Sequence, residues 1–255
     1  MTPVALTKVE ELIESLKPYM DQAQAVDVFT LQRFKRVALQ NRYAYPWAGF
    51  VALGMISVLE WNEEALDENY KHAIALRNDF DTHSSYSTAL QLFGKYEMAM
   101  HEAIKASSMA PENLTSLKTA IEYAQGAGHY TKSEELLEKM MARSTVAQRE
   151  SMGINEIKDV VCSALEIIEG NKTSEETITA SHRIAFRILR ENKTPFTSTR
   201  IETDSQDRYV MYYIDIDASL DVVDRLDEQL GLTLFDEIPD FDPDKYWIGY
   251  RKVEA

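Results

Sequence analysis

The stretch GKYEMAMHEAIKASSMAPEN, which runs from Gly94 to Asn113, decides the fold of this chain. Thirty-four residues after Gly94, a second stretch, GHYTKSEELLEKMMA, begins at Gly128. In both stretches a tyrosine follows the glycine by two residues, and a small residue, Ala99 or Ser133, follows it by five. A sequence that repeats at such a period predicts similar structural units that stack and share a core.

The repeated positions suit two helices joined by a tight turn. Glycine permits the left-handed backbone conformation that ends a helix. Alanines such as Ala99 and Ala106 let two helix axes approach closely, because their side chains are small. Pro111 cannot continue a helix and marks the end of the unit. These spacings therefore predict helical hairpins.

The pattern resembles the tetratricopeptide repeat, a family in which a glycine ends the first helix of each pair and small residues line the helix crossing. The best-matching unit is 80–113, which has the family's residue types at Gly94, Tyr96, Ala99, Ala106 and Pro111. Unit 114–147 matches more loosely, at Gly128, Tyr130, Ser133 and Met140.

A third, degenerate unit is expected at residues 46–79. Ala65 and Ala73 lie near the positions of the family's alanines, but the segment EWN at 60–62 replaces the Gly-x-Tyr turn and the spacing slips by one residue. An irregular helical bundle, in which these spacings coincide by chance, is the alternative to a repeat.

Further helices are expected on both sides of the repeats. Residues 4–24 carry apolar side chains at helical spacing, and residues 28–41 give a second helix. A helix over 154–171 follows the repeats and is expected to cover the last hydrophobic face of the stack. Within it, Cys162 belongs to an apolar run, which predicts a buried small side chain.

After the repeats the sequence changes character. A helix is expected over about 174–190, with Thr173 or Ser174 as its N-cap. Strands are expected at 200–202 and 209–216, and the second of these is rich in aromatic and β-branched residues.

The end of the chain predicts one more helix and one more strand. Asp217 is expected to cap a helix that stops at Gly231, and residues 246–250 are typical of a strand. The predicted fold is therefore mainly α: a tetratricopeptide-like helical-hairpin stack followed by a small C-terminal α+β unit. The expected domains are residues 1–170 and 171–255.

The net charge narrows the class of partner. The chain carries a formal charge of −15, and an acidic surface repels nucleic-acid phosphates and anionic membranes. Residues 200–255 hold 15 acidic and 6 basic residues, so this tail carries more than half of the net charge. We expect another protein as the partner, and neither nucleic acid nor a membrane. A basic surface on that partner and a homo-oligomer both stay open.

The sequence also predicts a compartment. No segment reaches the roughly 18 uncharged apolar residues that span a bilayer. Acidic residues at Glu10 and Glu11 interrupt any signal-peptide core. Because Cys162 is the single cysteine, no internal disulfide can form. These features predict a cytoplasmic protein.

Sequence patterns that carry catalysis are weak in this chain. Glycine-rich phosphate loops, nucleophile elbows and paired metal-ligand motifs do not occur in the sequence. The five histidines are expected at the surface or partly packed: His72, His83, His101, His129 and His182. We therefore expect neither an enzyme nor a cofactor.

Two acidic segments superficially suggest cation sites. The run from Asp215 to Asp221 resembles the start of a calcium loop, but Leu220 and Leu226 stand where glycine and glutamate are required. The other segment comprises Asp236, Glu237, Asp240, Asp242 and Asp244. A solvated loop is its default interpretation; a cation site, or a surface for a basic partner, is the alternative.

In tetratricopeptide proteins the first helix of each hairpin lines a groove that holds peptides or helices. The resemblance implies groove positions at Trp47, Phe50, Ser84, Thr88, Gln91, Lys118, Glu122 and Gln125. Of these only Lys118 suits the clamp with which some family members grip carboxylates, so that use is disfavoured. For Trp47 and Phe50, ordinary inter-helix core is the alternative.

Three functions follow from these patterns. The first is an adaptor or scaffold that binds a partner segment in the repeat groove. The alternative is an acidic inhibitor or immunity-type protein, whose tail, with Asp240, Asp242 and Asp244, covers a basic site on a toxin or nuclease. An enzyme that uses the α+β tail is the third hypothesis.

Overall fold

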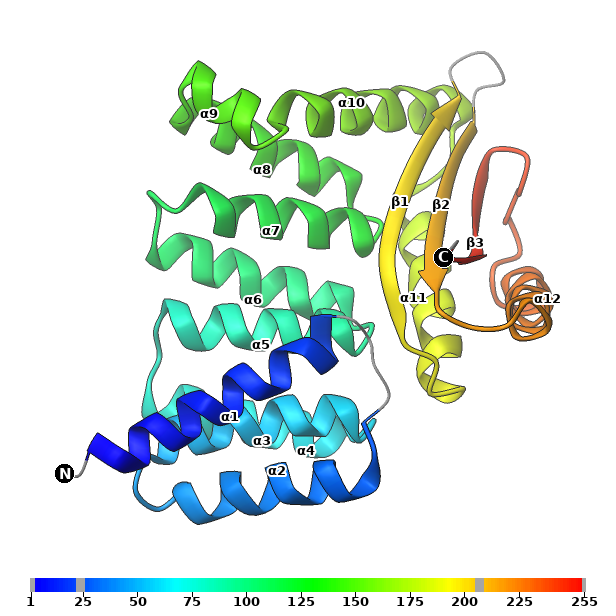
Figure 1. The fold of residues 1–255 in the computed structure, drawn as a ribbon. Coiled ribbons are helices and arrows are strands. Elements are labelled where there is room, and N and C mark those ends of the chain that lie inside the picture. Colours follow the sequence, from blue (N-terminus) through cyan, green and yellow to red (C-terminus); the bar gives the residue numbers. More distant parts are fainter. Residues whose placement is uncertain (1–2, 22–25, 205–208, 254–255) are drawn as a thin grey trace. The chain divides into compact units, whose positions relative to one another are not determined.

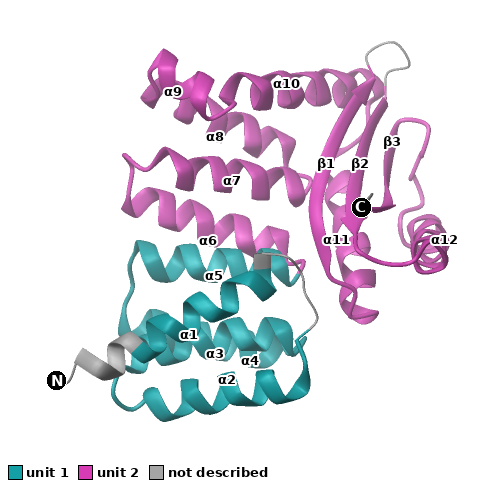
Figure 2. Cartoon of the chain, in the orientation of Figure 1, with its two compact units in different colours: residues 1–93 teal, residues 94–255 magenta. Residues whose placement is uncertain are grey.

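The computed structural model describes residues 3–21, 26–204 and 209–253, and its fold is mainly α with a small α+β unit at the C-terminus, as predicted (Figure 1). The chain divides into two compact units, residues 1–93 and 94–255 (Figure 2). The two units meet after residue 93, whereas the predicted domain boundary lies after residue 170. The two domains expected from the sequence stay a prediction.

Unit 1 consists of helices that surround one apolar helix. Its elements are α1 (Pro3–Asp21), α2 (Val28–Asn41), α3 (Pro46–Leu59), α4 (Glu63–Leu76) and α5 (Phe80–Leu92). Helix α3 is buried from Ala48 to Val58 except at the half-buried Phe50, and it packs against each of the other four. A helix that is apolar on every side must be covered on every side, so α3 organises the unit. The last predicted residues of the first helix, 22–24, lie outside the described residues.

Unit 2 contains the remaining helices and the sheet. Its helices are α6 (Tyr96–Met109), α7 (Leu114–Gly126), α8 (Tyr130–Arg143), α9 (Val146–Ser151), α10 (Ile154–Asn171), α11 (Glu175–Glu191) and α12 (Leu220–Glu237). Its strands are β1 (Phe196–Asp204), β2 (Tyr209–Ile216) and β3 (Tyr246–Lys252). Helix α7 packs between α6 and α8, and α10 packs on α8.

The hairpin period appears directly in the helix boundaries. The predicted units begin at residues 46, 80 and 114, which are the first residues of α3, α5 and α7. The predicted turn glycines adopt the left-handed conformation, with φ +73° at Gly94 and +80° at Gly128. In the degenerate unit Trp61 takes that conformation instead, with φ 53°. The helical-hairpin arrangement is therefore confirmed, including the unit in which glycine is missing.

The sheet has the order β1-β2-β3. Strands β1 and β2 are antiparallel, whereas β2 and β3 are parallel and are joined through α12. In Figure 1 the β1–β2 pair lies in front of α11. Alternate residues of β2, from Val210 to Ile216, point into a core that α10, α11 and α12 share.

This core also includes residues of the hairpin helices. Tyr96 of α6 and Tyr130 of α8 belong to the same hydrophobic cluster as Phe186 of α11 and Ile214 of β2. The turn glycines explain how α11 packs so closely against the hairpin turns. A Cβ atom at Gly94 would lie 3.3 Å from Phe186 Cβ, and one at Gly128 would lie 3.1 Å from the Thr179 backbone. The glycines that allow the chain to turn therefore also leave the space in which α11 packs.

Several local predictions need correction. β1 begins at Phe196 and not at residue 200, because its pairing with β2 extends the strand through polar residues. The N-cap of α12 is Ser219 and not Asp217. Cys162 is exposed, because α10 turns Val161 and Ala164 into the core and leaves the intervening residues outward. Ser174 is confirmed as the cap of α11, where its hydroxyl accepts from the Thr177 amide at 3.0 Å.

The predicted helix stop at Gly231 is wrong, because α12 continues for six residues beyond it, to Glu237. Leu230 and Leu234, on either side of the glycine, are both buried on the core side of α12. Tertiary packing of these leucines outweighs the low helix propensity of a single glycine.

We expect Gly231→Ala to raise the free energy of unfolding by about 1 kcal/mol, since glycine is disfavoured by that amount in a helix interior. A Cβ atom at this position meets nothing within 4 Å, so no clash opposes the gain. Urea denaturation measures the change, with exposed Glu228→Ala as control, which should shift stability by less than about 0.5 kcal/mol. A loss of stability in Gly231→Ala would contradict a continuous α12.

Candidate functional site

The predicted groove residues of unit 1 differ in their surroundings. Trp47 joins α3 to α5, since its Nε1–H donates to Thr82 Oγ1 at 2.7 Å. The Arg77 guanidinium lies over the Trp47 ring, 4.3 Å from its centroid. These contacts favour a structural role for Trp47. On α5, Ser84 and Gln91 are half-buried and Thr88 is exposed.

Phe50 lies instead in the wall of an open cavity. Its ring stacks on the His72 imidazole, with centroids 4.8 Å apart, and the Arg42 guanidinium lies 5.4 Å from its centroid. The cavity has a volume of about 450 Å³ and is lined by Arg42, Tyr43, Pro46, Phe50, Glu68, Asn69 and His72. We call it the α3–α4 pocket.

Three elements build the α3–α4 pocket. Arg42 and Tyr43 come from the turn between α2 and α3, Phe50 from α3, and His72 from α4. Tyr43 stands at the rim with 84% of its surface exposed, and Arg42 also lies over its ring at 5.6 Å. The pocket therefore offers aromatic area together with one cation, a combination common where proteins bind other proteins.

The sequence pointed to only one residue of this pocket, Phe50. Arg42, Tyr43 and His72 were missed because they lie outside the first helix of a repeat, where the family pattern places groove residues. An exposed aromatic residue beside a basic residue, in a turn between two helices, is the signal that would have found Arg42 and Tyr43.

The predicted groove residues of unit 2 lie on α7. Lys118 Nζ donates to the Met152 carbonyl oxygen at 3.1 Å, in the turn between α9 and α10, and lies 3.8 Å from Glu122 Oε1. Lys118 therefore helps to hold that turn. Glu122 is exposed and Gln125 is half-buried.

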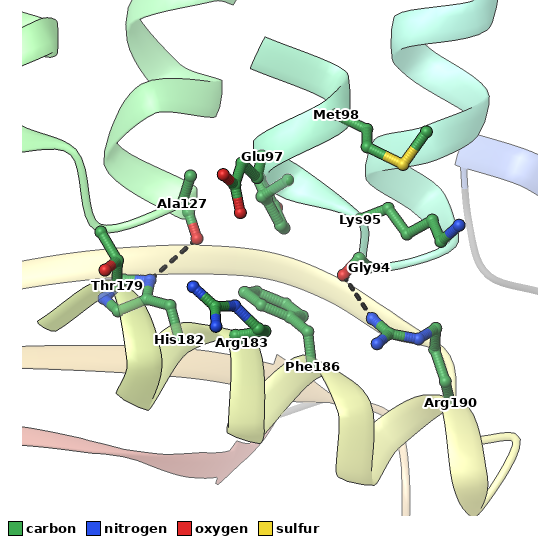
Figure 3. Close-up of a pocket in the computed structure, with 12 residues that line it drawn as sticks. Gly94, Lys95, Glu97, Met98, Ala127, Thr179, His182, Arg183, Phe186 and Arg190 are labelled. Atoms are coloured by element: carbon green, nitrogen blue, oxygen red, sulfur yellow. Dashed lines mark hydrogen bonds between the residues drawn. The ribbon is translucent and has the colours of Figure 1, made fainter. Parts of the chain in front are cut away.

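A smaller pocket of unit 2 lies where α11 crosses the turns (Figure 3). It encloses about 170 Å³ and is lined by Gly94, Lys95, Tyr96, Glu97, Met98, Gly126, Ala127, Thr179, His182, Arg183, Phe186 and Arg190. Arg190 Nη1 donates to the Gly94 carbonyl oxygen at 2.7 Å, and His182 Nδ1 donates to that of Gly126 at 2.8 Å. Both contacts bind α11 to the hairpin turns.

The expectation that the histidines are at the surface or partly packed is wrong for His83 and His182, because both are buried, and His182 is buried almost completely. The Gly126 carbonyl can only accept, so Nδ1 carries the proton, and Nε2 accepts from the Tyr246 hydroxyl of β3. Burial lowers the pKa of His182 to about 4, although the hydrogen bond to Gly126 partly opposes this change. The imidazole is therefore neutral at pH 7 and joins α11 to α7 and β3.

The buried core around His182 holds further tyrosines. The hydroxyl groups of Tyr130 and Tyr212 are buried and have no hydrogen-bond partner within the described part of the chain. Burial raises the pKa of both hydroxyls above the ordinary tyrosine value. Like His182, these tyrosines stay neutral at physiological pH.

The acidic tail is partly occupied by internal contacts. Asp242 pairs with Lys245 at 2.8 Å and accepts from the Asp244 amide at 3.1 Å, and its contact with Lys245 lowers the pKa of the Asp242 carboxyl. Asp240 and Asp244 are exposed. Asp215 is buried and accepts from Arg251 and Ser198. Across residues 3–21, 26–204 and 209–253, no group of three or more His, Cys, Asp or Glu side chains is arranged to hold a metal ion.

Two further findings are negative. Among the helices of the described residues, none is long and apolar enough to cross a membrane. No protein-family model, no curated protein and no solved structure matches this chain.

Proposed function

We propose that this chain is a protein-interaction adaptor or scaffold and not an enzyme. It binds a segment of a partner protein on its helical hairpins. A tetratricopeptide-like arrangement is part of the proposal. It is supported by helix starts at 46, 80 and 114 and by left-handed turns at Trp61, Gly94 and Gly128.

The α3–α4 pocket is the observation that carries the proposal. Its volume of about 450 Å³ is large enough for one or two partner side chains. The Arg42 guanidinium, the Phe50 ring and the His72 ring stack on one another and form one wall of the pocket. An aromatic or apolar side chain of the partner would extend this stack, and Tyr43 would close over it from the rim.

The residue types at the pocket agree with this use. Tyrosine and arginine are enriched among the residues that dominate binding energy at protein interfaces. Tyr43 has 84% of its surface exposed, so its ring contributes little to the folded state and is available to a partner. Glu68 and Asn69 supply polar groups at the edge of the cavity.

We expect Tyr43→Ser to weaken binding of the partner by about tenfold or more, because it removes an aromatic contact at the rim of the pocket. Affinity capture with chemical crosslinking identifies the proteins that the wild-type chain retains. Titration of the purified partner then measures the dissociation constant for both proteins.

Phe29→Ser is the matched control, since Phe29 is equally exposed, at 87%, and lies at the start of α2, away from the pocket lining. The control should retain the partner with unchanged affinity. A partner that binds Tyr43→Ser as tightly as the wild type would refute the pocket as its site.

A further inference from the structure

Gly231 lies in the middle of α12 for no reason that the fold of the chain supplies. The helix is continuous through it, and a Cβ atom there would meet nothing within 4 Å. The residue therefore serves neither a left-handed turn nor a close contact inside the protein. A glycine kept in a helix without an internal role can instead serve the close approach of another molecule.

The neighbours of Gly231 on the helix surface are also unusual. Glu228, Gly231, Leu232 and Phe235 follow the spacing i, i+3, i+4, i+7, which places them on one face of α12. The opposite face is the buried one, formed by Val223, Leu226, Leu230 and Leu234. We call the first set the α12 outward face.

The apolar part of this face is left open to solvent. Leu232 has 69% and Phe235 has 61% of its surface exposed. The Phe241 ring lies edge-on to Phe235, with centroids 5.8 Å apart, and extends the apolar area into the loop after α12. Because Gly231 beside them has no side chain, these residues form a low apolar platform and not a single exposed residue.

The surroundings of the platform are acidic. From residue 220 to residue 244 the chain holds nine acidic residues and one basic residue, Arg225. Asp224 and Glu228 precede the platform on the same side of α12, and Asp236 and Asp240 flank it; all four are exposed. A partner that covers Leu232 and Phe235 must therefore bring positive charge to the rim.

We infer that the α12 outward face binds a basic, amphipathic α-helix of a partner protein. Apolar side chains of that helix lie on Leu232 and Phe235, and Gly231 lets its backbone approach closely. Lysine or arginine side chains of the partner reach Asp224 and Glu228. This surface is separate from the α3–α4 pocket, so the inference does not rest on the function proposed above.

Charge also argues against a second copy of this chain as the molecule that binds the α12 outward face. If two α12 helices paired antiparallel, Asp224 and Glu228 of one would lie on Leu232 and Phe235 of the other. If they paired parallel, the acidic ends would face each other. The first arrangement buries unpaired carboxylates and the second brings like charges together, and both are unfavourable.

A synthetic helical peptide of about 16 residues, with leucine at i, i+3, i+4, i+7 and lysine elsewhere, tests the inference. Fluorescence anisotropy measures its dissociation constant with the full chain. A scrambled peptide of the same composition serves as the control for charge alone. We expect the amphipathic peptide to bind at least about tenfold more tightly than the scrambled one.

Variants of α12 separate the two components of binding. Leu232→Ser with Phe235→Ser should weaken binding by about tenfold or more. Asp224→Asn with Glu228→Gln should weaken it severalfold and reduce its dependence on salt between about 50 and 300 mM. Val146→Ser, at an equally exposed apolar residue (68%) on α9, should bind like the wild type.

The inference is overturned if the wild type fails to bind the amphipathic peptide, if it binds the scrambled peptide equally well, or if the serine double variant keeps full affinity. Self-association in sedimentation experiments that disappears in the double variant would also overturn it, in favour of a second copy. Tyr43→Ser should leave peptide binding unchanged, so this test and that of the α3–α4 pocket can fail separately.

Discussion

Gly128→Ala is expected to lower the free energy of unfolding by about 2 to 5 kcal/mol. Gly128 has φ +80°, and an alanine in the left-handed region is disfavoured by about 1 to 2 kcal/mol. The added Cβ would also lie 3.1 Å from the backbone of Thr179 and from Ile178 Cγ2. Because backbone atoms of α11 cannot swing aside, the helix must shift, and such overpacking adds about 1 to 3 kcal/mol.

Gly153→Ala is the matched control for the backbone contribution. Gly153 also has positive φ, +64°, but the nearest atom to its Cβ is Glu156 Oε2, the end of a flexible side chain, at 3.5 Å. It should lose only about 1 to 2 kcal/mol. Urea denaturation gives both values, and hydrogen exchange should show the added loss of Gly128→Ala in α11. If both variants lose the same free energy of unfolding, α11 does not pack against the Gly128 turn.

Acidification from pH 7 to pH 4 is expected to remove about 3 kcal/mol of stability through His182 alone. The pKa of this histidine is about 4 in the folded protein, against an ordinary value near 6.5 in the unfolded chain. Between these values the unfolded chain binds a proton and the folded chain does not. The free energy of unfolding therefore falls as the pH is lowered through this window, and the stabilisation is fully present above it.

The contribution of His182 can be isolated by comparing how the free energy of unfolding changes with pH in the wild type and in two variants. His182→Gln cannot titrate, so its curve should be flatter than that of the wild type between about pH 6.5 and pH 4. His101→Gln, at an exposed position on α6, should keep the wild-type slope. Acidic residues titrate in all three proteins and cancel in the comparison.

Nuclear magnetic resonance keeps this prediction testable if His182→Gln does not fold. The imidazole of His182 in the wild type should stay neutral at about pH 5.5. A protonated His182 signal at that pH would refute the low pKa.

The hairpin part of the fold could be predicted because its determinants are local. Glycine at a turn, alanine at a helix crossing and proline after a helix each act within one repeat, so a period of 34 residues shows them in the sequence. Trp61 is the exception. It takes the left-handed conformation without being glycine, and only the spacing of α3 and α4 indicates that a turn is required there.

The candidate site could be predicted only in part. Phe50 follows from its position in a repeat, whereas Arg42, Tyr43 and His72 join it from a turn and a second helix. Periodicity describes the face of one helix and contains no information about which neighbouring elements meet that face. Trp47 and Lys118 show the same limit, since their hydrogen bonds go to residues 35 and 34 positions away.

The sequence by itself determined the mainly helical class, the three hairpin starts, the strand-like segments of the tail and the acidic balance, because these depend on composition and short-range spacing. Tertiary structure alone decided that α11 rests on the turn glycines, that His182 is buried and neutral, and that α12 continues through Gly231. The physical reason in each case is packing between segments that are far apart in the sequence. Burial of apolar side chains on α11 and α12 decides where these helices lie and which groups lose contact with water, and local propensity does not encode it.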